Sequence, residues 1–242
     1  MSKYKNSLNQ PIGFPLDSWK TVKHPKGSIM PGRLCRLEPV NRDAHSEDLY
    51  SAYALDVENR NWTYLPYGPF ATLENFQSWI GSNCLDDDPC FFTVIDQKTG
   101  KAVGMASYLR IEPAVGVIEV GHIHFSPLMQ GSAISTEAMY LMMKLVFDDL
   151  GYRRYEWKCD ALNVPSCAAA KRLGFEFEGV FRQATIYKKR NRDTAWYSIL
   201  DQEWPSIKQT FENWLKAENF DSGGNQLSSL SSKMQMALRA IR

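Results

Sequence analysis

The sequence predicts an α/β (mixed α+β) domain, with a central, mostly antiparallel twisted sheet of about seven strands and helices on both faces. Apolar residues make up 44% of the 242 residues and charged residues 23%, which is typical of a globular domain. Hydrophobic periodicity gives the order strand, two helices, three strands, helix, strand, helix, two strands. The two later helices each join neighbouring strands, as crossover connections do.

The first part of the chain predicts an arm, a strand and two helices. Residues 1–32 are rich in Pro, Gly, Lys and Asn and are expected to form an irregular arm. The segment GRLCRLEPV reads as a short strand that Pro39 stops. Helices are expected in NRDAHSEDLYSAYAL, behind an Asn or Asp cap, and in TLENFQSWIGSNCL, behind Thr72.

The middle of the chain predicts strands around two further helices. CFFTVID and KAVGMASYLRI flank the turn QKTG as a hairpin, and GVIEVGHIHF is a third strand. A helix over TEAMYLMMKLVFDDL is expected to end at Gly151, and one over NVPSCAAAKRLG at Gly174, with the strand RRYEWKCD between them. FEFEGVFRQATIY and DTAWYSILD then form a hairpin around the basic turn KKRNR.

Residues 203–242 are expected to add a C-terminal helix and a flexible tail to the domain at 33–202. The helix WPSIKQTFENWLKAENF has Pro in its first turn. Apolar residues with a three-four spacing then follow in the tail: Leu227, Leu230, Met234, Leu238 and Ile241. This spacing fits a docking helix, and a frayed tail is an equal alternative.

Charge and cysteine content exclude several classes of protein. Lys and Arg total 28 against 27 Asp and Glu, so no basic field favours a nucleic-acid partner. No apolar run approaches about 18 residues and no signal-like segment opens the chain, so we expect a soluble, cytoplasmic protein without a membrane partner. The five cysteines form no C-x-x-C motif and are expected to be free thiols. No metal site is expected, because no further ligand cluster completes the pair His122 and His124.

The segment SPLMQGSAISTEAM predicts an anion site. From Gln130 to Thr136 the residues are mostly small or hydroxylic, and an acid and a long apolar run follow. The free N–H groups and the dipole at such a helix N-terminus attract phosphate. The loop matches neither the Walker A pattern nor G-x-G-x-x-G, so a different pyrophosphate cradle is needed.

Three segments together, IEVGHIHF, SPLMQGSAISTEA and NVPSCAAAKRLGFEFEGVFR, resemble the GNAT (Gcn5-related N-acetyltransferase) superfamily. The nearest branch is that of the ribosomal-protein N-terminal acetyltransferase-like (RimJ/RimL-type) proteins, and the similarity runs from about Gly32 to near Leu200. The family loop pattern Q/R-x-x-G-x-G/A falls on Gln130, Ala133 and Ser135; alanine replaces the first glycine, and serine stands where glycine or alanine is usual.

The resemblance implies a GNAT fold and acetyl-CoA as co-substrate. It also implies a set of residues that bind this co-substrate, from the strand end, the loop and a later helix: His124, Phe125, Ser126, Gln130, Gly131, Ser132, Ala133, Ile134, Ser135, Thr136 and Asn163. Backbone N–H groups of residues 122–125 would stabilise the oxyanion, and Asn163 would bind the pantetheine arm.

Acetyl transfer to an amine requires a base and an acid. The resemblance implies Glu119 as the base, eleven positions before Gln130; a solvated or ion-paired glutamate is a nearly equal alternative, and His122 and His124 are other candidates. The tyrosine acid of much of the family is absent, because Ala170 stands at its position. Ser166 is the candidate acid, with helix capping as an equal alternative.

The segment NWTYLPYGPF is the candidate acceptor wall. Trp62, Tyr64, Tyr67 and Phe70, with His122, would surround an amine-bearing substrate, or the four aromatic rings would instead plug a long loop. The basic segment KKRNRD is expected to be a solvated turn, with contact to an acidic substrate as the less favoured interpretation.

The predicted function is an acetyl-CoA-dependent N-acetyltransferase that transfers the acetyl group directly to a primary amine. A protein or peptide α-amino group is the preferred acceptor, since its pKa of about 7.7–8.0 lies far below the value of about 10.4 for lysine. Acetylation of a small amine and a non-catalytic acyl-CoA-binding module are the alternatives. The sequence leaves open whether the protein forms a homodimer.

Overall fold

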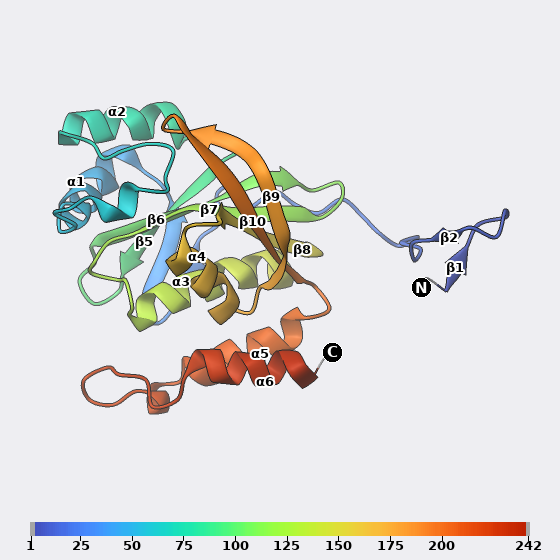
Figure 1. Ribbon diagram of the computed structural model, residues 1–242. Coiled ribbons are helices and arrows are strands. Elements are labelled where there is room, and N and C mark those ends of the chain that lie inside the picture. The colour runs from blue at the N-terminus through green and yellow to red at the C-terminus, as the bar shows by residue number, and fades with distance from the viewer. Residues whose placement is uncertain (1–2, 241–242) are drawn as a thin grey trace.

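The computed structural model describes residues 3–240, and its centre is an eight-stranded sheet in the order β3-β4-β5-β6-β7-β8-β10-β9 (Figure 1). All neighbouring pairs are antiparallel except β7 and β8, which run parallel. The strands are β3 (Met30–Pro31), β4 (Cys35–Pro39), β5 (Cys90–Asp96), β6 (Ala102–Glu112), β7 (Val117–Phe125), β8 (Arg154–Asp160), β9 (Glu176–Tyr187) and β10 (Arg190–Leu200). The predicted fold class is confirmed, and the strand beyond the expected seven is the short β3.

Two helices cover one face of the sheet. They are α1 (Arg42–Tyr53) and α2 (Leu73–Asn83), and the side chains of Asn41 and Thr72 cap them by accepting backbone N–H groups, as expected. A short helical turn, η1 (Arg60–Trp62), lies between them. Beneath these helices an aromatic cluster packs against the sheet, with Tyr53, Trp62 and Phe76 at its centre.

The other face carries α3 (Ala133–Lys144) and α4 (Val164–Arg172), the two crossover helices (Figure 1). The expected helix over 136–150 begins earlier, at Ala133, and its last part, Leu145–Asp149, is a π-helical turn. The carboxylate of Glu137 accepts the backbone N–H groups of Arg33, Leu34 and Cys35 at 3.1, 2.6 and 2.8 Å. One buried acid of α3 therefore fixes the start of β4.

The C-terminal segment forms a docked pair of helices below α3 and α4 (Figure 1). In α5 (Trp204–Trp214), Pro lies in the first turn, as expected. A short turn, η3 (Ala217–Asn219), leads to α6 (Leu230–Ala240), which packs against α5 and α4. Leu230 and Met234 are each only 1% exposed and Leu238 packs against the core, so these residues follow the docking-helix alternative. Leu227, at 67% exposure, precedes α6 and does not dock, and Ile241 lies outside the described residues.

The N-terminal arm is not wholly irregular. A small hairpin, β1 (Tyr4–Lys5) with β2 (Pro11–Ile12), extends away from the domain, and β3 at the end of the arm joins the main sheet (Figure 1).

The turn between β9 and β10 is exposed, as expected, but it is shorter than the basic segment of residues 188–193. Lys188 and Lys189 alone form it, with φ angles of 46° and 60°, as a two-residue hairpin turn with the strand twist requires. Lys188 Nζ donates to the carbonyl of Trp62 at 2.8 Å, and the Arg190 guanidinium donates to that of Thr63 at 2.7 Å. Two basic side chains therefore anchor the hairpin tip on η1. The sequence does not reveal this contact, because the two segments are far apart in the chain.

Candidate active site

The sheet opens where β7 and β8 part. Their parallel pairing covers Val117 to Val120 against Arg154 to Trp157 and then ends. Just beyond this point β7 is irregular, since its register with β6 shifts and His122 has a φ of 49°. Such a bulge re-aims side chains and leaves backbone groups unpaired in the ladder.

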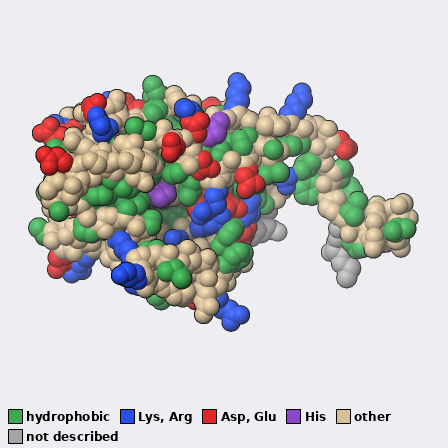
Figure 2. Space-filling model, turned by 90° about the horizontal axis from the view of Figure 1, so that it is seen from above, with side chains coloured by type: hydrophobic (Ala, Val, Ile, Leu, Met, Phe, Trp, Pro, Cys, Tyr) green, Lys and Arg blue, Asp and Glu red, His purple; other side chains and the backbone are tan. Residues whose placement is uncertain are grey.

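A cavity of about 680 Å³ lies at this opening, bounded by β7, β8, the start of α4 and the β9–β10 hairpin. Its size is that of a small-molecule site. The lining residues include Tyr64, Glu119, His122, Lys158, Ser166 and Arg192. Basic and acidic side chains lie side by side on the face shown in Figure 2, in keeping with the net charge of +1.

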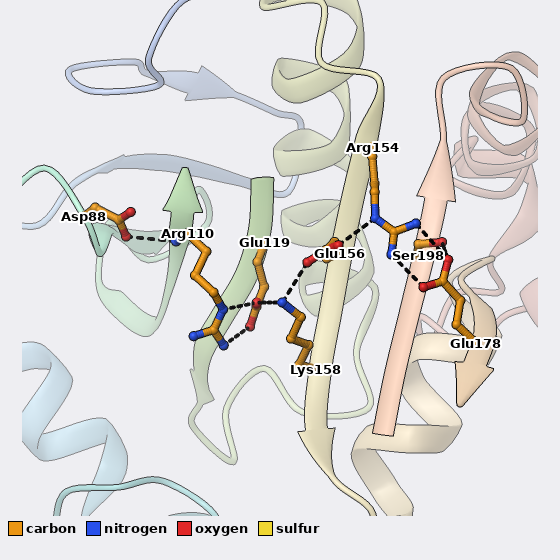
Figure 3. A network of polar contacts seen from close by, with 8 residues as sticks. All are labelled: Asp88, Arg110, Glu119, Arg154, Glu156, Lys158, Glu178 and Ser198. Carbon is orange, nitrogen blue, oxygen red and sulfur yellow. Dashed lines mark hydrogen bonds and ion pairs between the residues drawn. The ribbon is translucent and has the colours of Figure 1, made fainter. Parts of the chain in front are cut away.

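Glu119 and Asp160 are the acids that line this cavity, and Glu119 is only 2% exposed. Arg110 binds it through two bonds of 2.7 and 3.0 Å, and Lys158 Nζ lies 2.9 Å from Oε2 (Figure 3). Lys158 also lies 2.7 Å from Glu156, and Arg154 links Glu156 to Glu178. The ion-paired alternative for Glu119 is therefore the observed geometry.

Arg110 and Lys158 were not predicted as site residues from the sequence. A signal for Lys158 was present, because Arg154, Glu156 and Lys158 alternate along a strand that has neighbours on both sides. Charges on one face of an interior strand need partners on the strands beside them.

The two histidines of β7 face different surroundings. Burial, with Arg110 and Arg192 nearby, lowers the pKa of His122 to about 4, and its Nδ1 lies 3.2 Å from the Tyr67 hydroxyl. Burial lowers the pKa of His124 to about 3, and its ring stacks on Tyr53 at 3.8 Å inside the aromatic cluster. Both imidazoles are therefore neutral near pH 7, and His124 does not face the cavity.

The loop before α3 has the form of an anion cradle. Ser132 is the N-cap residue, but its hydroxyl donates to the Met129 carbonyl at 2.7 Å, and no side chain in residues 3–240 caps this helix. The first-turn N–H groups thus remain available to a ligand. Gly131 has a φ of 69° with open space around it, and Ala133 and Ile134 pack against the core. The loop fits a phosphate group, since its side chains leave the donors uncovered.

The amino-acid sequence also matches a known family. Residues 35–176, more than half of the chain, match the family model described as an acetyltransferase (GNAT) domain. The protein belongs to the GNAT family of acetyltransferases.

Solved structures agree with this assignment. A GCN5-related N-acetyltransferase from Brucella melitensis is 46% identical, with a TM-score of 0.89 over 91% of this chain and 100% of that one. A probable GNAT-family acetyltransferase from Chromobacterium violaceum is 37% identical, with a TM-score of 0.75 over 81% and 98%. The microcin C7 self-immunity acetyltransferase MccE, solved with acetyl-CoA and AMP, shares the fold at 22% identity, with a TM-score of 0.61 over 70% and 93%. The chain is thus an N-acetyltransferase with the predicted GNAT fold.

Five predicted residues of this GNAT enzyme line the same cavity: Tyr64, Glu119, His122, Asn163 and Ser166. The Asn163 side chain caps α4 by accepting the Ser166 N–H at 3.2 Å. The Ser166 hydroxyl accepts the indole N–H of Trp157 at 3.0 Å, and it also forms a side-chain hydrogen bond with Cys159. The capping alternative therefore applies to Asn163.

The predicted cofactor residues of the loop do not line the cavity. The Gln130 amide folds back and donates to the Phe125 carbonyl at 2.7 Å, and the Ser135 hydroxyl donates to the Ser132 carbonyl at 2.8 Å. Ser126 is fully buried, and the Thr136 hydroxyl accepts a bond of 2.5 Å from Arg172. Ligand contacts of this loop would thus come chiefly from its backbone.

The four predicted acceptor aromatics divide into two groups. Tyr64 lines the cavity, and Tyr67 reaches it only through His122. Trp62 and Phe70 do not line it; their rings meet edge to face at 5.5 Å within the aromatic cluster, as in the plug alternative. The wall opposite β7 comes instead from the β9–β10 hairpin, which the sequence analysis missed. This wall includes Arg192, Thr194 and Trp196 of β10. Their spacing of two places their side chains on one face of the strand, and this was the sequence signal for the wall.

No cluster of His, Cys, Asp or Glu suited to a metal ion occurs within residues 3–240. Over the same range, no helix is long and apolar enough to cross a membrane. The five cysteines are free thiols, and the sulfur atoms of Cys159 and Cys167 lie 3.5 Å apart.

Proposed function

We propose that this enzyme transfers the acetyl group of acetyl-CoA directly to a primary amine, in the manner of the ribosomal-protein N-terminal acetyltransferase-like branch. The observation that carries the proposal is that Glu119 of β7 and Ser166 of α4 line one cavity where β7 and β8 part. The uncapped N-terminus of α3 begins just after β7 and supports a pyrophosphate at the same edge of the sheet. A neighbour of the same fold was solved with acetyl-CoA.

In the proposed reaction the amine loses a proton before it attacks the thioester carbon. Glu119 accepts this proton, directly or through a water molecule, as the C–N bond forms. The C–S bond then breaks, and the Ser166 hydroxyl protonates the leaving sulfur. Backbone N–H groups around the bulge at His122 stabilise the oxyanion, and Asn163 holds the pantetheine arm.

The charges around Glu119 favour an easily deprotonated amine. Arg110 and Lys158 both contact its carboxylate, and Arg192 lines the same cavity. Positive charge disfavours a bound ammonium and so promotes loss of its proton. An α-amino group meets this requirement better than a lysine side chain, because its ordinary pKa is lower by about 2.5 units.

A small amine is the second candidate acceptor. The cavity measures about 680 Å³, and the β9–β10 tip, anchored on η1, bounds it on the acceptor side. A cavity of this size suits a small molecule or the first residues of a peptide.

Calorimetric titration with acetyl-CoA tests the donor, with free CoA and dephospho-CoA as controls. Micromolar binding is expected. A thiol-release assay with short N-terminal peptides and small amines then tests the acceptor. Absence of both binding and thiol release would contradict the proposed function.

Glu119→Gln and Ser166→Ala test the roles of these two residues. General acid–base catalysis contributes about 10²–10⁴-fold, so each change is expected to lower kcat/KM within this range. For Glu119→Gln the loss should be greatest at low pH, where the unassisted amine is mostly protonated. Glu47→Gln, on the exposed surface of α1, is the matched control. An unchanged pH profile in Glu119→Gln would exclude the base role.

A further inference from the structure

The basic tip of the β9–β10 hairpin carries positive charge that no acid of the described chain neutralises. Lys188, Arg190 and Arg192 take part in none of the ion pairs of residues 3–240. Lys188 and Arg190 donate to backbone carbonyls, which are neutral acceptors. The tip therefore brings net positive charge to the mouth of the cavity.

Arg192 is the member of this group that lines the cavity. Its Nε atom is buried and finds no hydrogen-bond acceptor among residues 3–240. Its guanidinium lies 5.9 Å from the centre of the Tyr187 ring. A buried, charged donor without an acceptor is costly, and a ligand that supplies an anionic oxygen removes this cost.

The other charged groups of the cavity already have partners. Arg110 and Lys158 share Glu119, and Lys158 also contacts Glu156. The nearest acid on β8, Asp160, accepts the Tyr187 hydroxyl at 2.8 Å and the Leu162 N–H at 2.9 Å. Arg192 is thus the lining cation that remains free for a ligand.

Arg192 lies on the acceptor side of the cavity. Its charge is felt at His122, next to the bulge where the amine would react. The loop over residues 126–136, which fits the cofactor phosphates, does not line this cavity, and the pantetheine arm that Asn163 would hold carries no anionic group. An anion that binds Arg192 therefore belongs to the acceptor.

We infer that the acceptor carries an anionic group, a carboxylate or a phosphate, in addition to its primary amine, and that Arg192 binds this group. The inference rests on the proposed function and names the class of its acceptor. The planar guanidinium of arginine suits both anions, because it can offer them two parallel N–H donors. The shared chemistry permits two sources: an acidic side chain close to a peptide N-terminus, or the anion of a small zwitterionic amine.

Acceptor pairs that differ only in charge test the inference by thiol release. Ser-Asp amide is compared with Ser-Asn amide, both with a C-terminal carboxamide in place of the carboxylate, and O-phosphoethanolamine is compared with ethanolamine, so the two pairs distinguish the two sources. A hydrogen bond to a charged partner predicts a preference in kcat/KM of about tenfold to a hundredfold for the anionic member of at least one pair. Arg192→Gln should reduce this ratio towards one, and Arg192→Lys should retain part of it.

Arg182→Gln is the matched control, since Arg182 is an exposed arginine of β9 that does not line the cavity. This variant undergoes the same change of charge and should keep the wild-type preference. Equal use of anionic and neutral acceptors by the wild type, or an undiminished preference in Arg192→Gln, would overturn the inference. Either result would leave the N-acetyltransferase proposal standing.

A binding measurement decides the role of Arg192 without turnover. The N-acetylated forms of Ser-Asp amide and O-phosphoethanolamine are titrated calorimetrically into the wild type, Arg192→Gln and Arg182→Gln. Binding of at least one compound to the wild type and Arg182→Gln, with at least tenfold weaker binding to Arg192→Gln, is expected. Equal affinity in all three proteins, or no binding to the wild type, counts against Arg192. Loss of acetyl-CoA binding and of all turnover would instead remove the proposed function.

Discussion

Lys158 joins two buried acids, and its replacement by methionine is expected to destabilise the protein strongly. Its Nζ atom lies 2.9 Å from Glu119 and 2.7 Å from Glu156, and 3.7 Å from the centre of the Trp196 ring. The side chain of Lys158 is 6% exposed, and those of Glu119 and Glu156 are 3% and 9% exposed. Lys158→Met keeps the volume of the side chain and removes the cation between the two carboxylates.

The magnitude follows from the remaining partners. Loss of one member of a buried ion pair costs about 3–5 kcal/mol, because the other charge stays buried. Glu119 keeps Arg110 and Glu156 keeps Arg154, so we expect the lower end, about 3 kcal/mol. For a chain of this length, that corresponds to a fall in Tm of roughly 6–12 °C.

Thermal and urea unfolding followed by circular dichroism measure the effect. Lys101→Met is the control, because Lys101 pairs with Asp48 at 2.8 Å on the surface and should contribute little. The double variant Lys158→Met with Glu156→Gln removes one of the two acids and should recover about 1 kcal/mol or more. A Tm of Lys158→Met close to that of Lys101→Met, or no recovery in the double variant, would refute the reasoning.

Three further predictions concern stability. His124 has a folded pKa of about 3, so as the pH falls below 6.5 the unfolded chain binds a proton that the folded protein does not. Its contribution to stability is therefore complete above pH 6.5 and declines by about 1.4 kcal/mol per pH unit below it. His124→Phe should remove this pH dependence from the free energy of unfolding measured in urea between pH 7 and pH 5. An unaltered pH dependence would contradict the assignment. Glu137→Ala leaves three backbone N–H groups without their acceptor and should cost at least about 3 kcal/mol in urea unfolding, with Glu137→Gln intermediate. Met234→Ala opens a cavity beneath α6 and should cost about 2 kcal/mol or more, whereas Met236→Ala, at 64% exposure, should be nearly neutral; equal effects would indicate that α6 is not docked in solution.

Most secondary structure could be predicted because it depends on neighbours in the sequence. Caps at Asn41 and Thr72, the periodicity of β5 to β7 and the stop at Gly151 are local signals, and the structure has the corresponding elements. The predicted elements differ from the observed ones where separate segments of the chain contact one another. The strand β3 forms because β4 pairs with it, and the basic turn has only two residues because Arg190 already pairs with Tyr187 across the hairpin.

The candidate site divides in the same way. The anion cradle before α3 could be predicted from the sequence, since a run of small residues ahead of a helix is a local pattern. The family resemblance added Glu119, Asn163 and Ser166, which line one cavity. No local sequence signal indicated which aromatic rings reach that cavity, because Tyr64 and Trp62 belong to the same short segment and differ only in what packs against them.

The sequence by itself determined the family, the order of the elements and the anion cradle, because each is a property of contiguous residues. Only the tertiary structure decided that Glu119 is bound by Arg110 and Lys158 and that Arg192 lies unpaired on the opposite wall. Ion pairs join residues from different strands, and the energy of a charge depends on how deeply the folded chain buries it. The charge of the acceptor is therefore decided by the packing of the β9–β10 hairpin over the opening between β7 and β8.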